Sequence, residues 1–330
     1  MDIKDQIINF YKENYILSSN KQQVLDGSAV VEDINESVFF NSNPGIGDIL
    51  SAFHLPKFLK KHEINSIVYN QNEEYFEKMA KYNADIDFDI DNLKSDHEKQ
   101  WKFFRLEIIQ AGFDFGGGHW FQNIQQSLGF EPDLKPKADL FVPNAKKQKG
   151  KVILNFSAGP DQARQKEEVH PRARELYPEH RDTIQKFINN NRNRYHFVEV
   201  DIESSNFENV ENKCGMDIDK SIEEIATCEY YLGIINGIMH VATALELKCI
   251  TILNFPSAHQ IYLPRLADLD LPDIDWLYPQ NVHLHEDDDA ELVQYLTYSN
   301  LEKAFNGEIY PFWEEDYINL FFEKCLKKKN

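Results

Sequence analysis

The sequence predicts an α/β protein built from two doubly wound, Rossmann-like domains. Apolar strands alternate with amphipathic helices along most of the 330 residues, which is typical of parallel sheets covered by helices on both faces. A Pro- and Lys-rich segment, EPDLKPKADLFVPNAKKQKGK, interrupts this alternation near residue 146. Because a strand–helix series runs on each side of the interruption, we expect one domain over residues 1–146 and a second over 147–330.

Composition excludes several functional classes. The chain is 42% apolar and 27% charged, as in globular proteins, and its net charge of −20 argues against nucleic acid or an anionic membrane as the main partner. The four cysteines lie far apart without C-x-x-C spacing, which indicates reduced thiols and no metal or disulfide framework. No apolar run reaches 18 residues and the charged N-terminus does not resemble a signal peptide, so we expect a cytoplasmic protein without a transmembrane segment.

In the first domain, short apolar stretches predict strands and longer stretches with apolar residues at helical spacing predict helices. The segment ADIDFDIDN alternates acidic and apolar residues, but it lacks the Gly and the terminal Glu of a calcium loop, so we interpret it as a half-exposed strand. The expected order is a helix over 3–17, a strand over 37–42, a helix from 47 to about 61, a strand over 64–69, a helix over 73–82, strands over 86–90 and 103–110, and a helix over 119–129.

The second domain continues the same alternation. Acidic residues at 286–289 suggest a metal site at first sight, but acids favour the first turn of a helix, so a helix start is the better interpretation. Aromatic residues at helical spacing in the tail predict a C-terminal helix. The other expected elements are a strand over 152–157, a helix over about 181–190, a strand over 195–202, a helix over 220–227, a strand over 229–235, a helix over 238–247, and strands over 249–255 and 282–285.

Residues 229–255 carry the strongest functional signal. An apolar strand leads into Asn236 and Gly237, a helix opens at once, and a second apolar strand follows. Free backbone N–H groups and the positive end of a helix dipole meet at such a turn and favour phosphate. Gly237 lets a diphosphate approach the main chain closely. The segment therefore predicts a phosphate-binding site at the carboxyl end of a strand.

A second strand–glycine–helix turn lies at Pro44-Gly45-Ile46-Gly47-Asp48. Asp48 stands at the helix start, where a carboxylate is favoured by the dipole and by free N–H groups. Two interpretations stay open: Asp48 caps the helix, or it faces a cleft as a general base within reach of a hydroxyl. The two glycines favour the second, because a simple cap requires neither.

The two turns together resemble those of the heptosyltransferase-like glycosyltransferases, glycosyltransferase family 9. In that family a G-x-G-D segment carries the catalytic aspartate, and Gly45-Ile46-Gly47-Asp48 is similar to it. A D-T/S-G-x-x-H segment holds the diphosphate of the sugar nucleotide, and residues 235–240 (INGIMH) match it in part. The resemblance implies the GT-B fold, in which two Rossmann-like domains face each other across a cleft and a C-terminal helix can pack back on the first domain.

The chain departs from the family pattern at two places. Ile235 and Asn236 stand where the family has an acid and a hydroxyl, so the contact of that acid with the donor sugar is lost while Gly237 and the helix start remain. The family's K-x-W-P segment, whose lysine contacts donor phosphate, corresponds to Arg174-Glu-Leu-Tyr177-Pro178 with a shifted register. The diphosphate-binding mode therefore carries over better than the identity of the sugar.

Further candidates surround these turns. The loop after the strand at 152–157 holds Ser157, Arg164 and Arg174, and in so acidic a chain its basic residues suggest a diphosphate clamp, the alternative being a solvated loop. On the donor side the resemblance also implicates backbone and side chains of Asn236, Gly237, Ile238, Met239 and His240, although a histidine near a helix start is equally often structural. On the acceptor side we expect Gly45, Gly47, His119 and Trp120; the last two follow a run of three glycines and have a packing role as the alternative.

The resulting expectation is an inverting, metal-independent glycosyltransferase without a cofactor. It would move a hexose or heptose from a nucleotide diphospho-sugar to a hydroxyl of a glycan, a lipopolysaccharide-like lipid or a protein, with Asp48 as general base. Two alternatives remain: a sugar-nucleotide epimerase or hydrolase on the same frame, and a non-catalytic nucleotide-sugar-binding relative. The nucleotide, the sugar, the acceptor and the oligomeric state are left open.

Overall fold

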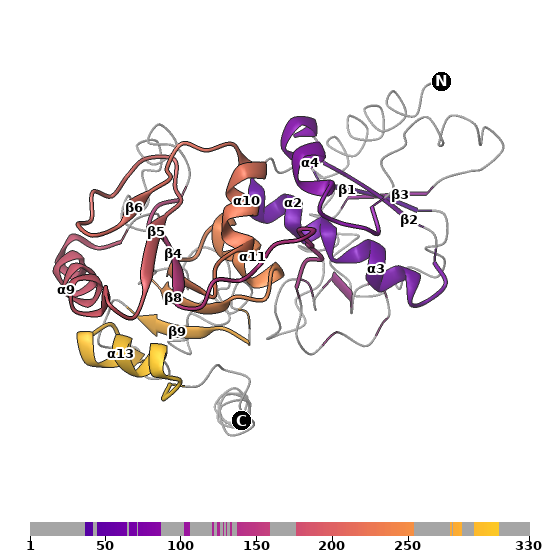
Figure 1. Cartoon of the computed structure of the whole chain (residues 1–330). Coiled ribbons are helices and arrows are strands. Elements are labelled where there is room, and N and C mark those ends of the chain that lie inside the picture. Colours follow the sequence, from indigo (N-terminus) through magenta and orange to yellow (C-terminus); the bar gives the residue numbers. More distant parts are fainter. Residues whose placement is uncertain are drawn as a thin grey trace, which may run out of the picture. The chain divides into compact units, whose positions relative to one another are not determined.

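In the computed structural model the chain folds as two compact units, Met1–Phe141 and Val142–Asn330. The residues described are 37–41, 45–64, 66–70, 72–86, 102–105, 121, 124, 125, 128, 130, 133, 137–158, 176–253, 278, 280–285 and 294–309. Each unit has its own parallel β-sheet, which confirms the predicted α/β class (Figure 1). The predicted division at residues 146 and 147, and the roles given to the two halves, stay predictions.

The first unit contains a parallel sheet in the order β2-β1-β3, with helices after β1 and β2. Helix α2 packs on β1 and β2 through an apolar side that includes the fully buried Ile49, Leu50 and Phe53. Its described elements are β1 (Ser37–Asn41), α2 (Ile46–Phe53), α3 (Leu55–Lys60), β2 (Ser66–Asn70), α4 (Glu73–Ala80) and β3 (Lys102–Arg105).

One expectation for this unit is wrong. We predicted a single helix from 47 to about 61, but the structure has two helices that meet at His54. Pro56 lies in the first turn of α3. Proline has no N–H to donate, and its ring clashes with the carbonyl of the residue four positions earlier, here Ala52. Pro56 is therefore tolerated at a helix start and would not be tolerated in the middle of a continuous helix.

The second unit is a parallel sheet in the order β10-β9-β8-β7-β4-β5-β6. Most predicted strands and helices are confirmed with shifts of a few residues at their ends, whereas the two-residue strands β6 and β10 were missed because they are too short to show a period. The described elements are β4 (Lys151–Asn155), η3 (Pro178–His180), α9 (Arg181–Asn191), β5 (His196–Glu199), β6 (Glu211–Asn212), α10 (Ile218–Ala226), β7 (Tyr230–Ile234), α11 (Gly237–Ala244), β8 (Lys248–Leu253), β9 (Val282–His285), β10 (Gln294–Tyr295) and α13 (Tyr298–Asn306).

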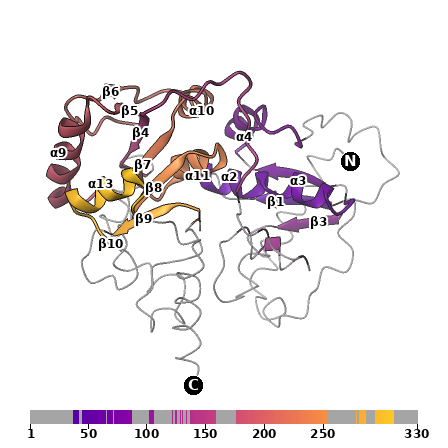
Figure 2. The ribbon, with the colours of Figure 1, turned by 60° about the horizontal axis from the view of Figure 1, so that its bottom comes forward.

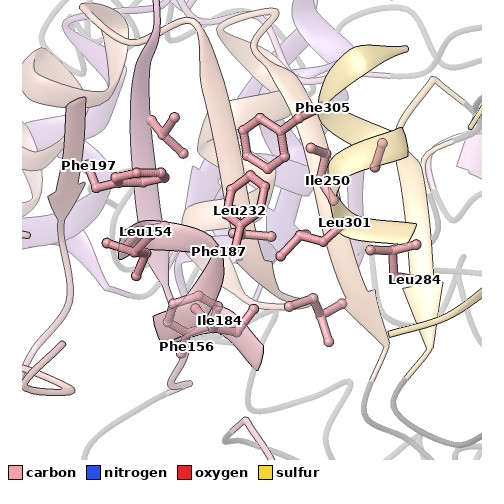
Figure 3. Packing of buried hydrophobic residues seen from close by; sticks show 14 of the residues in the cluster. Leu154, Phe156, Ile184, Phe187, Phe197, Leu232, Ile250, Leu284, Leu301 and Phe305 are labelled. Carbon is pink, nitrogen blue, oxygen red and sulfur yellow. The ribbon is translucent and has the colours of Figure 1, made fainter. Parts of the chain in front are cut away.

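Helices cover both faces of the second sheet. Figure 1 shows α9 and α13 on one side of the strands and α10 and α11 on the other, and Figure 2 shows α9 and α13 next to one another. Alternate residues of the central strands, such as Leu154, Leu232 and Ile250, point to the α9–α13 side and form one core with Phe187 and Phe305 (Figure 3). This is the doubly wound arrangement that the alternation of strands and helices predicts.

The order of the strands reverses beside β4. From β4 the chain moves outward through β5 to β6, and it then returns to place β7 on the opposite side of β4. The carboxyl ends of β4 and β7 therefore flank a topological switch point, which is where doubly wound sheets bind ligands. The two strands approach so closely there that a Cβ on Gly233 would overlap the carbonyl oxygen of Asn155 and lie 2.6 Å from the hydroxyl of Tyr231.

Several predicted segments lie outside the described residues. These are the helix at 3–17, most of the strand at 86–90, the helix that we expected after the acidic run at 286–289, and the C-terminal helix beyond 309. The helix expected at 119–129 is described only at isolated positions.

Candidate functional site

The N-terminus of α11 lies at the switch point. Strand β7 ends at Ile234, and α11 begins at Gly237, so Ile235 and Asn236 form the whole connection. Both residues are partly exposed, whereas the strand before them and the helix after Ile238 are buried. The strand–glycine–helix unit predicted from residues 229–255 is confirmed, and it stands where the fold favours a ligand.

The Asn236 side chain caps α11. Its Oδ1 accepts hydrogen bonds from the N–H groups of Ile238, at 3.0 Å, and Met239, at 3.1 Å. Asn236 itself is extended, with φ −165° and ψ −176°, as expected for a residue that precedes a helix. Gly237, at the first helical position, supplies an N–H that the cap does not use. The positive end of the helix dipole thus points to the carboxyl edge of the sheet with part of its donor set already engaged.

The same amide group ties α11 to the end of β4. The Asn236 Nδ2 group donates to the carbonyl oxygen of Ser157, at 2.8 Å, and also to Oδ1 of Asn155. Asn155 is buried and is the last residue of β4, and its own Nδ2 donates to the carbonyl oxygen of Val200, at 2.7 Å, just past β5. The ends of β4 and β5 and the start of α11 are therefore joined by two amides.

Ser157 is held by the carboxylate of Asp201. The Ser157 hydroxyl donates to Asp201 Oδ1 at 2.6 Å, and its backbone N–H donates to Oδ2 at 3.2 Å. Burial raises the pKa of Asp201, and the nearby Glu199 raises it further, against the lowering effect of the bonds from Ser157 and from the N–H of Ile202. Because the hydroxyl proton is committed to Asp201, Ser157 presents lone pairs to this edge of the sheet.

His240 is packed inside the second unit. Its side chain is buried, and its Nδ1 lies 2.7 Å from the hydroxyl of Tyr278. Burial lowers the pKa of His240 to about 4, so the ring is neutral at neutral pH. One turn further along α11, Thr243 is hydrogen-bonded to Asn281, whose Nδ2 lies 3.0 Å from the threonine hydroxyl. These buried contacts anchor α11 to the segment that leads into β9.

In the first unit, Gly45 is the N-cap of α2 and Asp48 lies in its first turn. Asp48 and Gly47 are partly exposed, and Gly45 is exposed. The Asp48 carboxylate folds back over Gly45, because a Cβ on Gly45 would lie 2.7 Å from Asp48 Oδ2. A side chain at position 45 would therefore require the Asp48 carboxylate to turn away from this position.

Some predicted site residues lie outside the described residues, namely His119, Trp120, Arg164 and Arg174. Of the described donor-side candidates, Ser157 and 236–238 lie partly exposed at the switch point, whereas Met239 and His240 are buried inside the second unit. Sequence reasoning missed Asn155 and Asp201. Each carried a signal: Asn155 is the polar residue inside the apolar stretch VILNF, and Asp201 is an acid near the end of the predicted strand over 195–202.

The described cysteines are free thiols. Burial raises the pKa of Cys214, Cys228 and Cys249 to about 12 in each case. A thiol of such high pKa is a poor nucleophile and a poor metal ligand at neutral pH. Among the residues that the structure describes, moreover, no group of three or more His, Cys, Asp or Glu side chains could hold a metal ion.

Comparisons with known proteins support the fold. No protein-family model and no curated protein sequence matches this chain significantly. The structure is similar to Escherichia coli ADP-heptose LPS heptosyltransferase II, with a TM-score of 0.54 and 10% identity over 89% of this chain and 100% of the other. It is also similar to E. coli heptosyltransferase WaaC with ADP, with a TM-score of 0.50 and 11% identity over 82% and 97% of the two chains.

A further similar structure is the iron-containing dodecameric glycosyltransferase TibC from enterotoxigenic E. coli H10407. The TM-score is 0.47 at 14% identity, and the match covers 66% of this chain and 58% of the TibC chain. The two nearly full-length matches confirm the GT-B fold and the likeness to the fold of the heptosyltransferases. Independence from metals stays a prediction. In the part of the chain that the structure describes, no helix has the length and apolarity needed to cross a membrane.

Proposed function

We propose that this protein is a heptosyltransferase-like glycosyltransferase that moves a sugar from a nucleotide diphospho-sugar to an acceptor hydroxyl. The observation that carries the proposal is the placement of the α11 N-terminus at the switch point between β4 and β7. The fold shared with two heptosyltransferases makes a sugar nucleotide the natural ligand for this edge. One of those structures contains ADP, so ADP is the first nucleotide to test.

On the donor side, we assign the diphosphate to the start of α11. The N–H of Gly237 and the helix dipole favour its negative charge, and Asn236 fixes the turn. Arg164 and Arg174, which follow Ser157 in the sequence, supply the positive charge that a departing diphosphate requires. Ser157 shapes the site through its carbonyl and its contact with Asp201.

On the acceptor side, we assign the role of general base to Asp48. Its carboxylate takes the proton of the acceptor hydroxyl as the hydroxyl oxygen attacks the anomeric carbon of the donor sugar. The bond from that carbon to the diphosphate oxygen breaks, and the nucleoside diphosphate leaves with the electron pair. Attack from the face opposite the leaving group inverts the anomeric centre. His119, Trp120, Gly45 and Gly47 are the other acceptor-side residues in this proposal.

The donor assignment is tested by binding. A thermal-shift screen against ADP-, UDP-, GDP- and CDP-sugars should reveal one donor that raises the melting temperature, since a ligand of the native state stabilises it. Incubation with this donor alone, followed by product analysis, separates a transferase from an epimerase or hydrolase, which would convert the donor without an acceptor. If none of these sugar nucleotides binds, the proposed function is wrong.

The base assignment is tested by Asp48→Asn. We expect transfer to fall by roughly 100-fold or more, as for loss of a general base, while donor affinity changes little. The matched control is Asp85→Asn, because Asp85 lies in the same unit and forms an ion pair with the exposed Lys60. Transfer at the wild-type rate in the Asp48→Asn variant would remove Asp48 from the mechanism.

A further inference from the structure

The Asn236 amide uses its full hydrogen-bonding capacity. An asparagine side chain offers two N–H donors and an oxygen that accepts two bonds. The oxygen accepts from Ile238 and Met239. The nitrogen donates to Asn155 and to the carbonyl of Ser157. The side chain is therefore both the cap of α11 and its link to the end of β4.

Serine, threonine and aspartate could not replace Asn236 in both roles. A serine or threonine would cap the helix, but a single hydroxyl proton cannot reach two acceptors, one on Asn155 and one on Ser157, while its oxygen accepts from the helix. An aspartate would place carboxylate oxygens against two acceptor oxygens, those of Asn155 and Ser157. The amide N–H of Asn236 is thus the donor that the Asn155 oxygen requires.

Asn155 is fixed from the opposite side. It is 1% exposed, its Nδ2 is bonded to the carbonyl of Val200, and its backbone is paired with Gly233 of β7. A buried amide held at both ends has one orientation available, since any other leaves a polar group unpaired. The direction of its Oδ1, and with it the position of Asn236, is therefore set by the sheet.

We propose that Asn155 is a positioning residue of the donor site, which acts through Asn236 to hold the start of α11 where the diphosphate binds. The proposal rests on the proposed function for the identity of the ligand. It adds to the donor site a residue that would not touch the donor. The two asparagines would act together through the hydrogen bond between their side chains. Without Asn155 the cap can still form, but the link between α11 and the end of β4 loses its buried anchor.

The first test needs no ligand. Hydrogen exchange at the backbone amides of Ile238 and Met239 is compared between the wild type, Asn155→Ala and the control Asn191→Ala. Asn191 is also a buried asparagine of the second unit, and its Nδ2 donates to a backbone carbonyl, that of Phe187. We expect faster exchange at the start of α11 in Asn155→Ala only. Equal exchange in the wild type and Asn155→Ala would overturn the proposal.

The second test measures ADP binding by calorimetry. Loss of one hydrogen bond corresponds to roughly fivefold in affinity, so we expect Asn155→Ala to bind ADP at least about fivefold more weakly, while Asn191→Ala binds like the wild type. The variant Asn236→Thr keeps a cap and removes both bonds to the end of β4, so it should weaken binding at least as much. Because both variants remove the bond between Asn155 and Asn236, the double variant Asn155→Ala/Asn236→Thr should bind no more weakly than the weaker single variant.

Steady-state kinetics give the readout that a merely structural role would not move. The KM for the sugar nucleotide should rise in Asn155→Ala, and the KM for the acceptor should stay unchanged. Wild-type affinity for ADP in Asn155→Ala, or effects of the two substitutions that simply add, would overturn the proposal. If the wild type itself binds none of ADP, UDP, GDP and CDP, the proposed function has failed, and this result is distinguishable because it appears without any substitution.

Discussion

Two histidines buried in the second unit should make this unit sensitive to mild acid. His240 and His283 are both buried, and both face Tyr278: His240 Nδ1 contacts its hydroxyl and His283 Nε2 lies 3.1 Å from its carbonyl oxygen. The polar side chains hydrogen-bonded to each other on the same two segments, Thr243 on α11 and Asn281 just before β9, are neutral. Burial lowers the pKa of each histidine from 6.5 to about 4, with the bond to Tyr278 opposing the shift for His283.

The sign and size of the effect follow from proton binding. Below pH 6.5 the unfolded chain takes up a proton at each histidine, whereas the folded chain resists until about pH 4. The stability that comes from burying the two rings in their neutral form is thus fully present above pH 6.5 and is lost as the pH falls toward 4. One pKa unit corresponds to about 1.4 kcal/mol, so protonation of each histidine lowers the free energy of unfolding by up to about 3 kcal/mol between pH 6.5 and 4.

The assay is urea unfolding followed by circular dichroism between pH 7.5 and 4.5, on the wild type and on His240→Gln, which has no ionisable ring. The free energy of unfolding should fall less steeply with decreasing pH in His240→Gln, by about 1 kcal/mol per pH unit below 6.5. His196→Gln, which removes a largely exposed imidazole beside Glu211, serves as the comparison variant. Parallel curves for His240→Gln and the wild type would refute the reasoning.

Three further substitutions test the frame that carries the site. Gly233→Ala should lower the melting temperature strongly, because a Cβ there overlaps the carbonyl of Asn155; an unchanged temperature would contradict the close approach of β4 and β7. Lys151→Met should cost about 2 kcal/mol in urea unfolding, since Lys151 is buried and pairs at 2.6 Å with Glu224, which keeps Lys213 as a second partner, whereas Lys220→Met, at an exposed pair, should cost under about 1 kcal/mol. Gly150→Ala should destabilise the protein to an extent measurable by calorimetry, because φ is +74° there and a Cβ would lie 2.7 Å from the carbonyl oxygen of Arg194; a wild-type transition would refute that.

Much of the fold was readable from local pattern. The apolar run at 230–234 and the short helix after Gly237 have the lengths and compositions of buried elements, so their existence was predicted and only their ends moved. The break between α2 and α3 was missed, although Pro56 indicates a helix start, because the apolar spacing continues across the proline. Strands β6 and β10 were missed because two residues show no period.

The candidate site likewise has features that follow from local sequence and contacts that depend on the tertiary structure. The sequence by itself determined where a phosphate-binding turn can form, because a strand, a glycine and a helix start are consecutive in the chain and their backbone donors are a local property. It also placed Gly45 and Asp48 in one turn, because they are three residues apart in the chain.

Only the tertiary structure decided which residues hold that turn. Asn155 and Asn236 are 81 positions apart, and Ser157 and Asp201 are 44 apart. They meet because β4 lies between β5 and β7, an order that depends on how the whole sheet buries its faces. Side-chain partners across strands are set by sheet order and register, and no local pattern in the chain encodes them.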